Sequence, residues 1–121
     1  MLKGSNSKII GSENWLAGDN NLVFGNKNEL SGNYNKIEGE QNKVGGEKND
    51  VKGRVNQILG NQNTVKGDIN KIFGDLNNVF GNENKVAGNQ NSISGNINVV
   101  KGDSNSVKGD ENLLEGSRNT I

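Results

Sequence analysis

Residues 60–66 read Gly60-Asn61-Gln62-Asn63-Thr64-Val65-Lys66, and residues 67–73 repeat this pattern with Gly-Asp-Ile-Asn-Lys-Ile-Phe. A glycine recurs every seven residues from Gly4 to Gly116. Asn follows the glycine by three residues from Asn14 to Asn119, and Val, Ile or Leu follows it by five. A short, fixed period is the sequence signature of a repeat architecture, in which one structural unit stacks on the next.

A seven-residue period first suggests a coiled coil, but a coiled coil needs two apolar positions in each heptad. This unit has only one dependable apolar position. It also contains a glycine in every unit, and a glycine inside a helix costs roughly 1 kcal/mol relative to alanine. Asn disfavours a helix further, because its side chain competes for backbone hydrogen bonds. The repeat is therefore not helical.

The pattern predicts a β-solenoid instead. Alternate side chains of a strand point to opposite sides, so Asn and Val of Asn-x-Val-x share the inner side. Glycine supplies the corner, where φ is positive, and the Asn, Asp and Ser residues after it are common in turns. We expect a continuous apolar stack and ladders of amides, each bonded to the coils above and below. In mid-chain this inward set is Asn56, Asn63, Asn70, Asn77, Asn84, Val65, Ile72 and Val79.

Seven residues are too few to enclose a core, so one coil contains two or three units. The residue just before the apolar position favours two units, because small polar and longer side chains alternate there. One series is Asp50, Thr64, Asn78, Ser92, Ser106 and Thr120, and the other is Lys43, Gln57, Lys71, Lys85, Val99 and Leu113. A competing signal is a set of large residues that recurs every 21 positions: Tyr34, Val55, Leu76 and Ile97. We favour an all-β solenoid of 14 residues per coil with two parallel sheets, and residues 1–121 as a single repeat domain.

Composition argues against several classes of function. The 14 basic and 14 acidic residues are mixed along the chain, so the sequence predicts no basic patch that would bind nucleic acid. No apolar run is long enough for membrane insertion, and the chain start lacks the apolar stretch of a signal peptide. Without His or Cys, most nucleophile–base pairs and zinc sites are excluded. We expect no enzymatic activity, no cofactor and no metal. The compartment stays undetermined, with an extracellular or cell-surface location preferred.

Two stretches carry apolar residues at outward positions. Trp15 lies in residues 1–24, the least regular part of the chain, either in a terminal cap or on a contact surface. A second set shares one face in the 14-residue register, and a patch of this kind predicts lateral association. This set comprises Val55, Leu59, Ile69, Phe73, Ala87, Ile97 and Val99.

The unit x-x-Asn-x-Val-x-Gly resembles the repeat of the grass ice-binding proteins, the ryegrass-type inhibitors of ice recrystallisation, from Gly4 to Ile121. The resemblance implies a left-handed β-roll of about two heptads per coil, with Asn ladders at its corners and a Val core. It also implies ice binding through a flat, Thr-rich face. The nearest equivalent here is the series Thr64, Asn78, Ser92, Ser106 and Thr120. That series is flanked by Lys66, Phe80, Ser94 and Lys108, where an ice face would carry small uncharged groups.

Three hypotheses for function follow. The first is a structural protein that stacks end to end on copies of itself into a filament, because an uncapped solenoid exposes unpaired strand edges. Its end contacts would be Leu2, Ile9, Leu114 and Ile121. The second is an ice-binding protein, with ice as the partner. The third is the stalk or head segment of a surface adhesin, since similar short-period rolls occur there.

Overall fold

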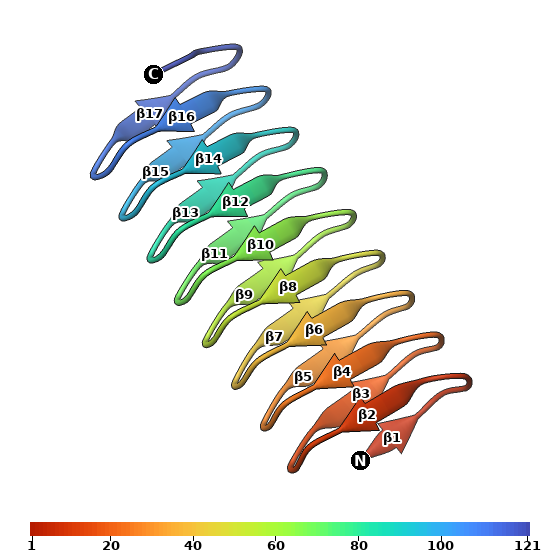
Figure 1. Cartoon of the computed structure of the whole chain (residues 1–121). Helices are drawn as coiled ribbons and strands as arrows, with labels where there is room; N and C mark the ends of the chain where they lie inside the picture. The colour runs from red at the N-terminus through yellow and green to blue at the C-terminus, as the bar shows by residue number, and fades with distance from the viewer.

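The computed structural model describes residues 1–121 as a rod of stacked coils, with the two chain ends at opposite ends of the rod (Figure 1). All regular structure is β-strand, in 17 strands, of which all but the first are three residues long. Each strand is followed by a glycine-initiated turn that leads into the next strand. The prediction of an all-β solenoid is confirmed.

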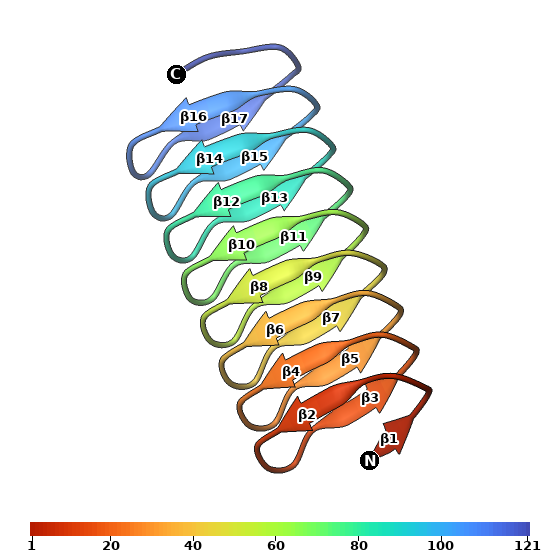
Figure 2. The same ribbon diagram turned by 45° about the vertical axis from the view of Figure 1, so that its right-hand side comes forward.

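The strands form two parallel sheets, and successive strands alternate between them (Figure 2). The nine-stranded sheet contains β1 (Leu2–Lys3), β3 (Trp15–Ala17), β5 (Glu29–Ser31), β7 (Lys43–Gly45), β9 (Gln57–Leu59), β11 (Lys71–Phe73), β13 (Lys85–Ala87), β15 (Val99–Lys101) and β17 (Leu113–Glu115). The eight-stranded sheet contains β2 (Lys8–Ile10), β4 (Leu22–Phe24), β6 (Lys36–Glu38), β8 (Asp50–Lys52), β10 (Thr64–Lys66), β12 (Asn78–Phe80), β14 (Ser92–Ser94) and β16 (Ser106–Lys108).

The strand register settles the length of a coil. Val65 of β10 pairs with Val79 of β12, and Ile72 of β11 pairs with Val86 of β13. Each residue thus lies beside the residue 14 positions further along the chain, which confirms two heptads per coil and excludes three. Neighbouring coils are separated by about 4.8 Å, the ordinary distance between paired strands.

The core is one residue wide in each sheet. Its buried apolar side chains occupy the middle position of each strand from Leu16 to Val107, and Ile9 and Leu114 pack against it partly buried. The inward Asn residues from Asn14 to Asn105 are buried as well. The predicted separation of inward and outward residues is therefore confirmed, including Val65, Ile72 and Val79 in the core.

The inward Asn side chains form two ladders along the rod. In one, the Nδ2 of Asn70 donates to the Oδ1 of Asn56 at 3.1 Å, and the Nδ2 of Asn84 donates to Asn70 in the same way. In the other, Asn77 donates to Asn63. Ser7 holds the ladder position in the first unit, and its Oγ accepts a hydrogen bond from the backbone N–H of Asn21 at 3.1 Å. Both ladders were expected from the sequence.

Each turn contains two residues with positive φ. Gly67, with φ of 133°, is followed two positions later by Ile69 in the left-handed region, with φ of 61°. A Cβ at Gly67 would collide with the carbonyl oxygen of Gly81 in the next coil. Glycine is required there for its conformation and for the close approach of two stacked backbones.

A third set of hydrogen bonds crosses between the turns. The residue after each glycine, where it is Asn or Asp, accepts a hydrogen bond from the backbone N–H one coil earlier. Examples are Asp75 Oδ1, which accepts from Asn61 N–H at 2.7 Å, and Asn82 Oδ1, which accepts from Asp68 N–H at 2.7 Å. The sequence predicted these residues as turn formers, and the structure adds that they bind one coil to the next.

Candidate functional site

The outer face of the eight-stranded sheet carries a straight row of short, uncharged polar side chains. The pairing Thr64–Asn78–Ser92–Ser106 runs in register through β10, β12, β14 and β16, and an isolated parallel bridge extends it to Thr120. We call these five residues the hydroxyl–amide row. Their side chains repeat at the strand spacing of about 4.8 Å. The structure therefore brings together all five residues that the sequence suggested as an ice-binding series.

A second row lies beside the first. Its residues follow the core residue of each strand, whereas the residues of the hydroxyl–amide row precede it. Lys66, Phe80, Ser94 and Lys108 follow each other in register there. The ammonium group of Lys66 lies 5.4 Å from the centre of the Phe80 ring, within reach of a cation–π contact. This flanking row is less regular than the hydroxyl–amide row, because it mixes cations, an aromatic ring and a hydroxyl.

Charge on the eight-stranded sheet is concentrated in β6 and β8. The carboxylate of Glu38 lies 3.0 Å from both Lys36 and Lys52. The hydrogen bond from Lys36, followed by that from Lys52, lowers the pKa of Glu38, and the hydrogen bond to Glu38 raises the pKa of Lys36. Asp50 lies beside Lys36 in the same strand pair. This charged block precedes the hydroxyl–amide row, which itself contains no charged side chain.

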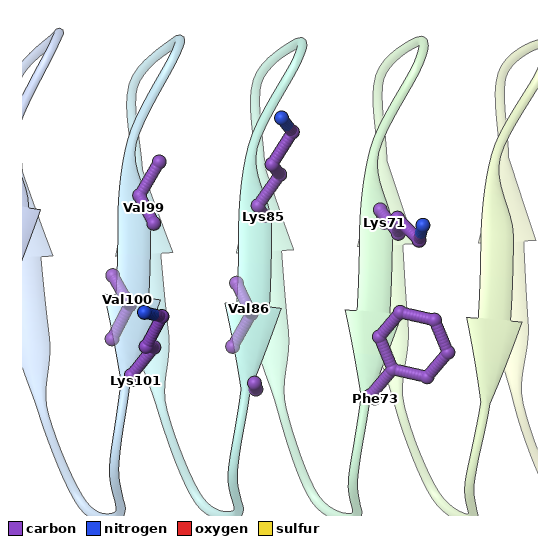
Figure 3. A pocket seen from close by; sticks show the side chains of 8 residues that line it. Lys71, Phe73, Lys85, Val86, Val99, Val100 and Lys101 are labelled. Carbon is purple, nitrogen blue, oxygen red and sulfur yellow. The ribbon is translucent and has the colours of Figure 1, made fainter.

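The outer face of the nine-stranded sheet has a different character. Before the core residue it carries the longer series that includes Gln57, Lys71, Lys85 and Val99. An open groove of about 180 Å³ is lined by residues of β11, β13 and β15 (Figure 3). Lysines and apolar side chains line this groove, and no carboxylate does. The two faces of the rod are therefore chemically distinct.

The apolar residues expected to share one face are divided between two surfaces. Leu59 and Phe73 pair in register on the nine-stranded sheet, and Val99 lies on the same face. Val55, Ile69 and Ile97 instead occupy the left-handed position of the turns, on the edge of the rod. The expectation of a single shared face is wrong, because each preceding strand ends just before Gly53, Gly67 or Gly95 and the chain bends before these residues are reached. Trp15 lies on the nine-stranded sheet in β3, well before the groove.

The residues proposed for end-to-end contacts lie in the outermost coils. Leu2 is in β1, Ile9 in β2 and Leu114 in β17. Ile121 follows the bridge at Thr120 and is about half exposed.

No three His, Cys, Asp or Glu side chains are placed to hold a metal ion. The chain forms no helix, and so none of the long apolar kind that crosses a bilayer. The surface carries a regular polar row on one face and a mixed apolar and basic groove on the other.

Comparison with known proteins supports the interpretation of the repeat. A family model described as the grass antifreeze beta roll matches residues 1–74 and again residues 54–121, and the two matches together cover the whole chain. A comparison with curated proteins finds no match.

Proposed function

The chain belongs to the grass antifreeze β-roll family, and on that premise we propose that it binds ice and inhibits ice recrystallisation. The family relation favours this function over the filament and adhesin hypotheses. The observation that carries the proposal within this chain is the hydroxyl–amide row on the eight-stranded sheet.

The regularity of the row supports recognition of a crystal surface. Ice presents a periodic array of water molecules, so a matching surface needs groups at a constant spacing. Parallel strands in exact register supply that spacing, at about 4.8 Å per coil. The two ends of the row, Thr64 and Thr120, are β-branched, and β-branching restricts the rotation of their side chains. The side chains at the two ends of the row are therefore restricted before ice is bound.

The absence of charge in the row supports the choice of this face. An ammonium group is compact and strongly hydrated, and its hydration shell competes with an ordered layer of water. The nine-stranded sheet carries Lys43, Lys71 and Lys85 at the equivalent positions. The N-terminal half of the eight-stranded sheet carries Lys36 and Asp50. Among the positions that precede the core residue, the stretch from Thr64 to Thr120 forms an uninterrupted row of uncharged polar residues. The uncharged row on the nine-stranded sheet, from Ala17 to Ala87, contains one polar residue, Ser31.

The flanking row limits the area of the proposed contact. Lys66 and Lys108 stand beside the hydroxyl–amide row, so the flat uncharged surface is narrow. A narrow contact suits inhibition of recrystallisation, which needs adsorption to grain boundaries, better than a large depression of the freezing point. We expect a small thermal hysteresis accompanied by clear inhibition of recrystallisation.

A matched pair of lysine substitutions tests the assignment. Ser92 lies at the centre of the row in β14, and Ser31 is an exposed serine on the outer face of the nine-stranded sheet in β5. Ser92→Lys should raise the protein concentration needed to inhibit recrystallisation by about tenfold or more, since ~1.4 kcal/mol of lost contact is tenfold in affinity. Ser31→Lys should leave the required concentration unchanged.

Circular dichroism should show the same β-sheet content in both variants. Equal losses of inhibition in the two variants would contradict the assignment of the ice-binding face. No inhibition by the unmodified protein would contradict the function itself.

A further inference from the structure

One edge of the rod carries β-branched residues in a conformation that such residues avoid. The turns that lead into β9, β11 and β15 place Val55, Ile69 and Ile97 at φ of 59°, 61° and 59°. Left-handed φ is a steric outlier for β-branched residues. The opposite edge places Gln62, Leu76, Gln90 and Ser104 at the equivalent positions of β10, β12, β14 and β16, with no β-branched residue.

These strained side chains are also exposed. Val55, Ile69 and Ile97 are 50%, 54% and 48% exposed, so they stabilise no core. Strain that the fold does not need is a reason to look for function at the strained residues. The same column of turns contains Glu83 and Glu111, and neither carboxylate takes part in an ion pair. We call this surface, from Val55 to Glu111, the acidic edge.

The groove on the nine-stranded sheet is complementary in charge. Lys71, Lys85 and Lys101 surround the apolar surface of Phe73, Ala87 and Val99, and Figure 3 shows these side chains on three neighbouring strands. Lys101 is paired with Glu115 at 2.9 Å. Lys71 and Lys85 take part in no ion pair. We call this surface the lysine groove.

We propose that the acidic edge of one molecule docks into the lysine groove of a second copy of this chain. Ile69 and Ile97 would cover the apolar floor of the groove, and Glu83 and Glu111 would pair with Lys71 and Lys85. Glu83 and Glu111 lie two coils apart, about 9.6 Å, whereas Lys71 and Lys85 lie one coil apart, about 4.8 Å. Each of the two ion pairs would therefore be displaced by about half a coil step, which the long, flexible Lys side chains can span.

The geometry also determines how the assembly grows. The edge and the groove lie on different sides of the rod, so the contact is heterologous, and a pair of molecules retains one free edge and one free groove. Addition of further copies is then possible. The hydroxyl–amide row lies on the other sheet and stays uncovered. Lateral association is therefore independent of the proposed ice-binding face.

Sedimentation velocity of the full chain over a range from low to high micromolar concentration tests this proposal. We expect species larger than the monomer whose fraction rises with concentration and falls with added salt, because ion pairs between exposed groups are screened. A sharp monomer at every concentration in low salt would overturn the proposal.

Two sets of variants distinguish the proposed contact from nonspecific association. Ile69→Asn with Ile97→Asn should abolish the larger species, whereas Leu76→Asn on the opposite edge should not. Leu76 is a matched control because it also has a left-handed φ and is 48% exposed. An equal loss of association in both would refute the role of the acidic edge.

Charge reversal supplies a test that a fold defect cannot mimic. Lys71→Glu with Lys85→Glu should be monomeric, and so should Glu83→Lys with Glu111→Lys, because each variant then opposes like charges. An equimolar mixture of the two variants should restore the larger species. Failure of the mixture to associate, with both variants folded by circular dichroism, would overturn the pairing of these two surfaces.

Discussion

At the scale of single residues, Asn77 shows how the rod tolerates so many buried amides. Its Nδ2 donates to Asn63 Oδ1 at 3.1 Å and to the carbonyl of Gly88 at 2.8 Å. Its Oδ1 accepts from the backbone N–H and the Nδ2 of Asn91, both at 3.0 Å. A buried polar group left unpaired is costly. The complete set of four partners therefore makes the Asn position as restrictive as the apolar one.

Asn77→Ala should destabilise the protein by about 1–3 kcal/mol, because the backbone N–H of Asn91 and the carbonyl of Gly88 lose their partner inside the rod. Urea unfolding followed by circular dichroism measures this change. Asn78→Ala is the control: Asn78 is the next residue, lies on the exposed face and should change stability by no more than about 0.5 kcal/mol. Equal midpoints for the two variants would show that the ladder does not stabilise the rod.

Ile69→Asn should have the opposite effect on stability. A left-handed backbone costs an L-residue roughly 1–2 kcal/mol, and Asn tolerates it better than a β-branched residue. With φ of 61° at Ile69, we expect a gain of about 1 kcal/mol in the free energy of unfolding. Leu59→Asn should bring no gain, because Leu59 is exposed on an extended strand. A loss of stability in Ile69→Asn would contradict the assignment of strain to this turn.

At the scale of elements, a strand of three residues carries one inward side chain between two outward ones. In β11 the inward residue is Ile72, which is fully buried, while Lys71 is exposed and Phe73 partly so. One buried side chain cannot stabilise a strand by itself. Each strand therefore depends on its two parallel neighbours, as β11 depends on β9 and β13.

Substitutions at adjacent residues of β11 should differ sharply for this reason. Ile72→Asp would place an unpaired charge between the sheets and should unfold several coils or the whole rod. Phe73→Asp changes only the outer face and should leave the fold intact. Circular dichroism measures the β-sheet content of the two variants, and thermal melting measures their stability. Similar melting temperatures for both variants would require the inward and outward positions to be exchanged.

At the scale of the whole molecule, two periods operate at once. The core repeats every seven residues, so Val79 and Val86 have the same environment in different sheets. The outer surfaces repeat every 14 residues, so the hydroxyl–amide row and the lysine groove each belong to one sheet. Stability therefore depends on the heptad, whereas surface function depends on the pair of heptads.

Deletions of one heptad and of two heptads distinguish the effects of the seven-residue and 14-residue periods. Removing residues 81–87 preserves the heptad pattern but moves every later strand to the opposite sheet, so Thr64 and Asn78 would lie on one face and Ser92 on the other. Removing residues 81–94 takes away twice as much chain but keeps the remainder of the row on one face. Both variants should fold, because the core units are equivalent.

Recrystallisation assays should show much weaker inhibition for the seven-residue deletion than for the 14-residue deletion. Equal inhibition would mean that the hydroxyl–amide row is not the surface that binds ice. If circular dichroism showed the shorter deletion to be unfolded, the units would not be equivalent in the core.

The heptad by itself determined the inner part of this protein. The strand, the corner glycine, the inward Asn and the apolar stack were all predictable, because alternation along a strand and positive φ at glycine are local properties. The 14-residue coil also followed, from the alternation of Thr64, Asn78 and Ser92 with the longer series. The same alternation grouped the five residues of the hydroxyl–amide row, and the family resemblance suggested ice as their partner.

Only the tertiary structure decided how the remaining outward residues are grouped. Val55, Ile69 and Ile97 belong to a turn edge and not to a flat face, because each lies past the glycine at which the strand direction changes. The bond from Asn61 N–H to Asp75 was not predictable either, because it depends on two turns stacked one coil apart. Inward positions are set by a repeated local pattern, whereas outward neighbours are set by the packing of one coil on the next.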